Sequence, residues 1–396
     1  MYGRGASRSA SEQQQSEERR EGHKKGPSAK PRTQNTLGSL AHHASDRAAM
    51  PSALLARAAP AGAPSMLQPL AAPSQWCDAD GCLPDVMILG TQKAATSALF
   101  KLLEREEFAC PTARKEEHFF DAPRNFGADN LTAAPGRLAA YRRLFDPSKC
   151  AQRGAGVHFV DATPNYLSRP FVAPRIAAAY PPSLRPQLRL IAVLREPVSR
   201  GLSWYNHKLH GWTERDMGTT YEGINQTFCA GGGAEAPAPT FTAEAACNLD
   251  LLERNPHVAG AQHSIVEVGF YAEHLRSFAR VVDRRQLLVV NMHHIDAKLL
   301  GLVVDFVGGA ARGRTLALPT ANTQDFGGKV REIDCATRAR LEALYAPWNA
   351  MLYSDLREAR AAGRTPPQEP DFGEFDAHGV NCTDAPLAPP TREVRL

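Results

Sequence analysis

The stretch 84–99 constrains the fold of this chain more than any other part of the sequence. It opens with the apolar run 86–89, which is typical of a buried parallel strand. Gly90 then permits a tight turn. The apolar positions that follow repeat at helical spacing and are Ala98, Leu99, Leu102 and Leu103. A strand, a short loop and a helix in this order direct backbone N–H groups and a helix N-terminus toward one point, which predicts an anion-binding site.

The position of Lys93 separates two kinds of phosphate-binding loop. A Walker A loop, which binds nucleoside triphosphates, carries its Gly-Lys pair at the end. Here Lys93 is third after Gly90, and Thr96 and Ser97 stand where Gly-Lys would be expected. The spacing therefore argues against a nucleotide triphosphatase. A plain strand, turn and helix with a surface lysine is the alternative, because short loop motifs are weak signals on their own.

A second motif follows the apolar run 188–194, which predicts another strand. Arg195 comes directly after it, and Ser203 lies on the helix that Pro197 is suited to begin. An arginine at this place can bind phosphate oxygens through paired, charge-assisted hydrogen bonds, and a serine can donate its hydroxyl. The alternative for Arg195 is a surface ion pair.

Two further stretches carry carboxylates. Residues 115–121 read Lys-Glu-Glu-His-Phe-Phe-Asp, and residues 161–166 read Asp-Ala-Thr-Pro-Asn-Tyr. A carboxylate such as that of Glu116 can take a proton from an attacking hydroxyl or amine if it lies within hydrogen-bond reach. An exposed charged turn ahead of two core phenylalanines is the structural alternative for the first stretch.

Together these four stretches resemble the motifs of sulfotransferases that use 3′-phosphoadenosine 5′-phosphosulfate (PAPS). They are most similar to those of the heparan sulfate 3-O-sulfotransferases and the N-deacetylase/N-sulfotransferases, over about residues 84–357. The resemblance implies an α/β fold: one P-loop-NTPase-like domain with a central, mostly parallel sheet flanked by helices. It also implies transfer of a sulfuryl group from PAPS to a hydroxyl or amine of a carbohydrate acceptor, similar to a glycosaminoglycan.

The same resemblance implies roles for individual residues. Glu116 becomes the catalytic base, Lys93 stabilises the leaving group, and His118 lies beside the base. The residues implied to bind PAPS are Lys93, Ala94, Ala95, Thr96, Ser97, Arg195, Ser203 and, from a loose match to a basic loop, Lys329. No metal is implied.

Candidate acceptor-binding residues are less well defined by the sequence. They are Asp121, Arg200, His207 and Lys208. The last three also fit the solvated face of one helix equally well. The sequence departs from the family pattern at two positions that bear on catalysis and acceptor identity. Ala162 replaces a lysine, and Ala95 replaces a glycine. A non-catalytic relative that binds glycans or nucleotides therefore stays open as an alternative, and so does a nucleotide kinase.

The predicted elements alternate between strands and helices, which favours a mostly parallel sheet with right-handed crossovers. The expected strands cover residues 86–89, 158–162, 188–194 and 287–291. The expected helices follow Lys93 and Pro197 and also cover residues 137–145, 271–282, 336–346 and 347–360.

Composition suggests three parts in the chain of 396 residues. Residues 1–75 are rich in Ser, Gln, Ala, Pro and charge, and we expect them to be disordered. The folded sulfotransferase-like domain is expected at 84–360, followed by an irregular tail at 361–396. The net charge of +4 comes from residues 1–50, where nine basic side chains face five acidic ones. The rest of the chain is balanced, which gives no reason to expect a nucleic-acid partner.

Eight cysteines occur without the spacing of a metal site. Cys77–Cys82 and Cys229–Cys247 are the local candidates for disulfides, and free buried thiols fit equally well. Glycosylation sequons begin at Asn130, Asn225 and Asn381. With the family resemblance they suggest the Golgi lumen or the secretory pathway. No signal peptide or membrane-spanning segment is visible in the sequence, so membrane association is not predicted, and a transit segment or a missing start stays open.

Overall fold

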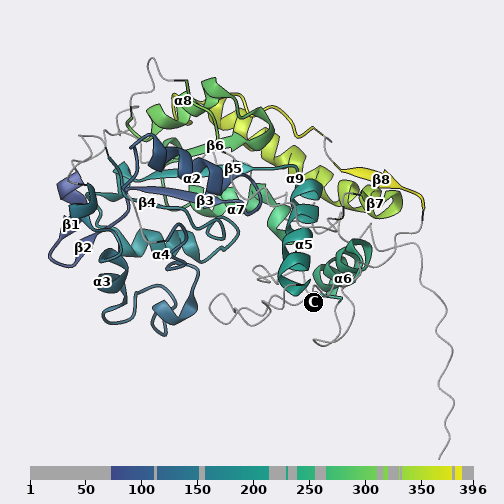
Figure 1. Ribbon diagram of the computed structural model, residues 1–396, viewed down its shortest axis with the longest axis horizontal. Coiled ribbons are helices and arrows are strands. Elements are labelled where there is room, and N and C mark those ends of the chain that lie inside the picture. Colours follow the sequence, from purple (N-terminus) through teal and green to yellow (C-terminus); the bar gives the residue numbers. More distant parts are fainter. Residues whose placement is uncertain are drawn as a thin grey trace, which may run out of the picture. The chain divides into compact units, whose positions relative to one another are not determined.

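A computed structural model describes residues 73–110, 114–150, 157–213, 229–230, 239–254, 265–309, 315–319, 330, 332–376 and 380–385. Its centre is a four-stranded sheet in the order β4-β3-β5-β6. The strands are β3 (Val86–Gly90), β4 (Val160–Asp161), β5 (Arg189–Leu194) and β6 (Leu287–Asn291), and every neighbouring pair is parallel. The predicted α/β class, with a parallel sheet flanked by helices, is confirmed (Figure 1).

Both faces of the sheet are buried, which explains why its strands read as continuous apolar runs. On β3, Met87 and Leu89 face one hydrophobic cluster and Val86 and Ile88 face another. The first cluster is covered by α4 (Val172–Ala179), α7 (Tyr271–Ala279) and the second half of α9 (Cys335–Ala361). The second is covered by α2 (Thr96–Arg105) and α8 (Ala297–Phe306).

A third hydrophobic cluster lies between α5 (Pro197–Thr213), α6 (Phe241–Arg254) and the first half of α9. The ring of Tyr205 on α5 meets that of Phe241 on α6 edge-on, with centroids 5.5 Å apart. Figure 1 shows these two helices together, beside the sheet rather than over it. The cluster therefore anchors α5, the helix that follows Arg195.

Helix α9 differs from the prediction of two helices that meet at residue 347. It is one helix, with Pro347 in its interior. Pro347 removes one backbone hydrogen bond, which would ordinarily end or kink a helix. The buried side chains continue at helical spacing on both sides of it, and they are Leu341, Leu344, Trp348 and Leu352. Their burial stabilises one continuous helix despite Pro347, because each large apolar side chain contributes about 1.5–3 kcal/mol.

The shorter elements are less predictable from the sequence. Helix α3 (Arg137–Arg142) and strand β4 are shorter than expected, and α7 ends at Ala279. The hairpin β1 (Cys77–Asp78) with β2 (Gly81–Cys82) and the parallel pair β7 (Glu332–Asp334) with β8 (Asn381–Thr383) were not anticipated. The 3-10 turns are η2 (Pro73–Trp76), η3 (Pro123–Asn125), η4 (Pro147–Cys150), η5 (Arg185–Gln187), η7 (Glu267–Gly269), η8 (Arg284–Gln286) and η9 (Met292–His294).

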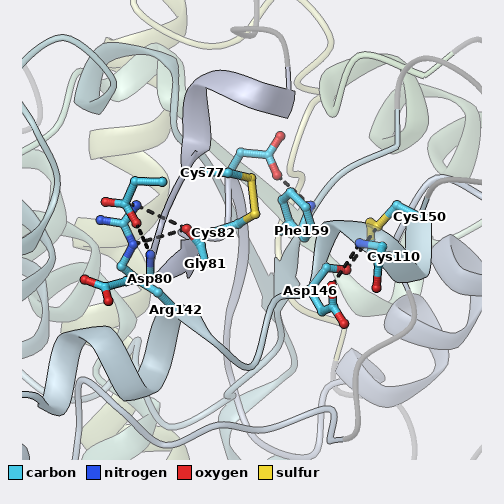
Figure 2. Close-up of a disulfide and its surroundings, with 12 residues drawn as sticks. Cys77, Asp80, Gly81, Cys82, Cys110, Arg142, Asp146, Cys150 and Phe159 are labelled. Carbon is cyan, nitrogen blue, oxygen red and sulfur yellow. Dashed lines mark hydrogen bonds and ion pairs between the residues drawn. A yellow bond between two sulfur atoms is a disulfide. The ribbon is translucent and has the colours of Figure 1, made fainter.

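All eight cysteines form disulfides. The two local candidates, Cys77–Cys82 and Cys229–Cys247, are both present. Cys110–Cys150 and Cys335–Cys382 join more distant positions that spacing alone did not single out. Figure 2 shows the first pair beside Arg142, which donates to the carbonyl oxygen of Gly81. Figure 2 also shows the Cys110–Cys150 bridge. Glu116 lies between these two cysteines in the sequence.

The backbone after α9 packs against the outer strand of the sheet. Glu369 forms an ion pair with Arg284 at 2.7 Å and accepts a hydrogen bond from the backbone N–H of Val289 on β6 at 3.0 Å. Phe372 is buried in the core. Strand β8 follows, so this part of the chain is less irregular than its composition suggests. The boundaries drawn at residues 75, 84 and 360 stay predictions, and residues 1–72 lie outside the described part.

None of the helices in the described ranges combines the length and the apolar composition needed to span a bilayer.

Candidate active site

Three of the sequence motifs meet at one edge of the sheet. Strands β3, β4 and β5 end at Gly90, Asp161 and Leu194, and parallel strands bring their carboxyl ends to the same edge. Ligand sites of open α/β sheets lie at this edge. Gly90 has φ +133°, and a Cβ there would lie 2.2 Å from the carbonyl oxygen of Pro164. Only glycine allows this close approach of the loop after β3 to the loop after β4.

The loop after β3 ends at the start of α2. Lys93 and Ala95 both have positive φ, 69° and 61°, so the loop turns sharply at each of them. Ala95 is the N-cap of α2 and offers no side-chain hydrogen bond. Helix N-termini without a side-chain cap leave backbone N–H groups for a ligand or water, and their dipole favours an anion. Of the other loop residues, Ala94 and Thr96 are buried and Ser97 is half-buried.

Arg195 lies against this loop. Its Nη1 donates to the carbonyl oxygen of Lys93 at 3.1 Å. Its Nε is buried and has no hydrogen-bond partner within the described ranges. The hydroxyl of Tyr271 donates to the carbonyl oxygen of Arg195 at 2.7 Å, which fixes the backbone there. Burial lowers the pKa of Arg195, with a contribution from the nearby charge of Arg200. A cation with an unused, buried N–H group suits an anionic ligand.

Ser203 lies on α5 and is half-buried. Lys329, the remaining residue expected to bind PAPS, lies outside the described residues.

Glu116 is held between two basic side chains. Its Oε1 lies 2.6 Å from Nζ of Lys115, and its Oε2 lies 3.3 Å from Nε2 of His118. Nζ of Lys115 also lies 3.5 Å from the hydroxyl of Thr96, at the start of α2. Burial alone would raise the pKa of Glu116, but His118 and Lys115 outweigh it and lower that pKa below its ordinary value. Glu116 is therefore ionised at neutral pH and lies close to the anion loop.

His118 links Glu116 to a second carboxylate. Its Nδ1 lies 2.8 Å from Oδ2 of Asp121, and only 8% of the residue is exposed. Burial alone would lower the pKa of His118, yet the two carboxylates raise it to about 10. The ring therefore carries a positive charge at neutral pH. In this state it cannot take a proton.

Glu117 has a different environment from its neighbour. Burial and the charge of Asp161 raise the pKa of Glu117 to about 7. Its Oε1 is buried without a hydrogen-bond partner among the described residues. The family resemblance implies a role for Glu116 alone, but the residue pattern does not show that the two adjacent glutamates differ in environment. The structure gives one a depressed pKa and the other a raised pKa.

A buried network lies beneath this segment. Asp161 is completely buried and accepts hydrogen bonds from three hydroxyls, those of Tyr141, Thr163 and Tyr166, at 2.7, 2.7 and 2.9 Å. Burial raises the pKa of Asp161. The motif 161–166 was recognised in the sequence, but the contribution of Tyr141 carried no signal there because it lies 20 residues away.

The candidate acceptor residues do not gather at one surface. Asp121 lies beside His118, as its position in the motif suggests. Arg200 is completely buried and donates to the carbonyl oxygen of Ile265. Lys208 pairs with Glu244 at 3.1 Å, and both side chains are 0% exposed. His207 is half-buried against Trp204, with ring centroids 5.1 Å apart. Arg200 and Lys208 thus point into the protein, which does not fit the expected contact with an acidic saccharide.

Across the described ranges, no three His, Cys, Asp or Glu side chains are grouped so that they could hold a metal ion.

Comparison with known proteins gives similarity to sulfotransferases. The chain is 25% identical over 299 residues to the human heparan sulfate glucosamine 3-O-sulfotransferases 3B1 and 3A1, a region that is 68% of this chain. The match spans 63% and 60% of the length of these two relatives. The membrane-associated sulfotransferase kil1 of Dictyostelium discoideum is 27% identical over 141 residues, 36% of this chain and 26% of its own.

Among solved structures, a sulfotransferase from Alicyclobacillus acidocaldarius has a TM-score of 0.48 and 24% sequence identity. That likeness covers 72% of this chain and 99% of the bacterial one. No protein-family model matches the chain.

Proposed function

We propose that this chain is a PAPS-dependent sulfotransferase, because it is distantly similar to the heparan sulfate 3-O-sulfotransferases, with 25% identity over 68% of its length. The observation that carries the proposal is the proximity of three features: an anion-binding loop that contains Lys93, the half-buried Arg195, and the carboxylate of Glu116. Arg195 contacts the loop at Lys93, and Lys115 connects the loop at Thr96 to Glu116.

The proposed donor site has two parts. The 5′-phosphosulfate of PAPS binds the loop 90–97 and the N-terminus of α2, where backbone N–H groups and Lys93 balance its charge. The 3′-phosphate binds Arg195, whose buried Nε lacks a partner within the described ranges, together with Ser203. The proposal that Lys329 adds a contact rests on the sequence resemblance alone.

The proposed reaction is a direct, in-line transfer. Glu116 takes the proton of the acceptor hydroxyl or amine as that oxygen or nitrogen forms a bond to sulfur. The bond between sulfur and the bridging oxygen breaks, and 3′-phosphoadenosine 5′-phosphate leaves with the electron pair. Lys93 stabilises the negative charge that develops on that oxygen. His118, held as a cation, fixes the orientation of Glu116.

We propose a carbohydrate acceptor, supported by the similarity to enzymes named for glucosamine sulfation. His207, which is half-buried, remains a candidate for contact with it, while Asp121, Arg200 and Lys208 are all buried. Four disulfides favour an oxidising compartment, which supports the secretory pathway as the place of action. The sequons at Asn130 and Asn381 are exposed and are proposed as glycosylation sites, and Asn225 lies outside the described residues.

The test uses PAPS with a labelled sulfuryl group and a panel of glycans. The panel contains heparan sulfate, its N-desulfated form and neutral oligosaccharides, and the readout is label in the glycan fraction. Transfer to any of them supports the proposal. Binding of 3′-phosphoadenosine 5′-phosphate without transfer would identify a non-catalytic relative. Binding of ATP with magnesium and no response to PAPS would contradict both and favour a nucleotide kinase.

A further inference from the structure

The segment that follows Glu116 is fixed by two hydroxyl groups. The hydroxyl oxygen of Thr163 accepts from the backbone N–H groups of Glu117 and His118, at 3.1 and 3.2 Å. The hydroxyl oxygen of Tyr166 accepts from those of Phe119 and Phe120, at 3.0 and 3.3 Å. Four consecutive amides are therefore held by two side chains from the loop after β4.

Asp161 determines the orientation of both hydroxyls. A hydroxyl group has one proton to donate and lone pairs with which to accept. Thr163 and Tyr166 each use their lone pairs on two amides, so each directs its single proton to the carboxylate of Asp161, at 2.7 and 2.9 Å. Because Asp161 is completely buried, solvent does not compete for these protons.

The segment held in this way contains a backbone conformation that is unfavourable without such support. His118 has φ +50°, in the left-handed region that residues with a Cβ seldom occupy. Its N–H is one of the two bound by Thr163. The conformation places the imidazole between Glu116 and Asp121. The carbonyl oxygen of Lys115 also accepts from the N–H of Ala162, which fixes the segment on the other side of Glu116.

We propose that Asp161 is a positioning residue for Glu116, acting through the hydroxyls of Thr163 and Tyr166 on the backbone of residues 117–120. Asp161 touches neither donor nor acceptor in this role, which rests on the proposed function of Glu116 as the base. Loss of either hydroxyl frees two amides and lets the segment shift. A shift of about 1 Å in a catalytic group is enough to lower the rate by about 10²-fold.

The experiment compares Thr163→Val, Thr163→Ser and Tyr166→Phe with the full-length wild type. Val has the shape of Thr without its hydroxyl, and Ser restores the hydroxyl. Tyr180→Phe is the matched control, because Tyr180 is equally buried and its hydroxyl bonds to the carbonyl oxygen of Pro84, outside this network. Two quantities are measured: amide hydrogen exchange at residues 117–120, and kcat and KM for PAPS.

We expect Thr163→Val and Tyr166→Phe to speed exchange at these four amides by about tenfold or more, since each amide loses a hydrogen bond. We expect kcat to fall by at least about tenfold with little change in the KM for PAPS, because the loop 90–97 and Arg195 are untouched. Thr163→Ser should restore both quantities, and Tyr180→Phe should change neither.

Exchange at wild-type rates in Thr163→Val and Tyr166→Phe would overturn the proposal. Faster exchange with an unchanged kcat in an active enzyme would also overturn it. In that case the backbone of residues 117–120 would be more mobile, and catalysis by Glu116 would not depend on its position. If the wild type transfers no sulfuryl group, the proposed function fails by itself, and the exchange measurement still decides whether this network holds the segment.

Discussion

Nη1 of Arg195 donates a hydrogen bond to the carbonyl oxygen of Lys93, 3.1 Å away and 102 residues earlier in the chain. This bond brings together the two places where the sequence predicted anion binding. Under the proposed function, one nucleotide with phosphate groups on the 3′ and 5′ positions of its ribose binds across both places.

Arg195→Ala should remove discrimination in favour of the 3′-phosphate. The wild type is expected to bind 3′-phosphoadenosine 5′-phosphate more tightly than adenosine 5′-phosphate by about 10- to 100-fold, the usual contribution of a hydrogen bond to a charged group. In Arg195→Ala the two affinities should become similar, as measured by calorimetry. In Lys93→Ala, by contrast, both affinities should fall together. An unchanged preference in Arg195→Ala would assign the 3′-phosphate to another residue.

Glu116→Gln should lower kcat by at least about 10²-fold and leave donor binding intact, because the amide cannot take a proton. The adjacent Glu117→Gln is the matched control and should keep most of the activity. Both are measured by transfer from labelled PAPS. A larger loss of kcat in Glu117→Gln than in Glu116→Gln would assign the role of base to Glu117. The comparison is informative because the pKa of Glu117 is raised.

Glu117→Gln should stabilise the protein at high pH but not at low pH. Burial raises the pKa of Glu117 from 4.5 to about 7 on folding. Below pH 4.5 both the folded and unfolded states are protonated, so the group contributes no difference. As pH rises toward 7 the unfolded state ionises first, and stability falls. The glutamine variant lacks this loss, so its Tm should exceed that of the wild type at pH 8 and match it at pH 4. Equal differences at both values would refute the assignment.

Replacing Cys110 and Cys150 together with Ala should destabilise the protein more than replacing Cys77 and Cys82 together. The first pair closes a span of 40 residues and the second a span of 5. Loop entropy predicts losses of about 4 and about 2 kcal/mol. Urea denaturation of the two double variants measures the difference. The first variant should also lose activity below its unfolding midpoint, because the span contains Glu116.

Lys208→Met should lower stability by about 3 to 5 kcal/mol, since it leaves the carboxylate of Glu244 buried without its charge partner. The double variant Lys208→Met with Glu244→Gln should recover much of the loss. Thermal unfolding measures both. Acceptor affinity should be unchanged in whatever fraction folds. A stable Lys208→Met variant with weakened acceptor binding would restore Lys208 to the acceptor site.

The strands of the central sheet were predictable because buried parallel strands appear in the sequence as continuous apolar runs. Strand β6 matches its expected range of 287–291, and β3 and β5 match to within a residue. The single helix α9 was not predicted, because Pro347 is a strong local signal for a break and the packing that overrides it is a property of the tertiary structure.

The candidate site was only partly predictable. The motifs predicted roles for Lys93, Glu116, His118 and Arg195, but not the contacts among these side chains and their neighbours, which depend on distances across the sheet edge. Lys208 was predicted at the surface but is buried. Its neighbours on the helix suggested a basic surface, and only the position of Glu244 on α6 reveals a buried pair. Sequence order alone does not show which face of α5 packs against another helix.

The segment after α9 has a consequence for solubility. Strand β6 is the last strand of the sheet, and its outer edge would otherwise present unpaired backbone groups to other molecules. Glu369 accepts the N–H of Val289, and the side chain of Asn291 donates to the carbonyl oxygen of Phe372 at 3.4 Å. A chain shortened at residue 360 would expose this edge, and we expect it to self-associate through strand pairing even where the catalytic residues are intact.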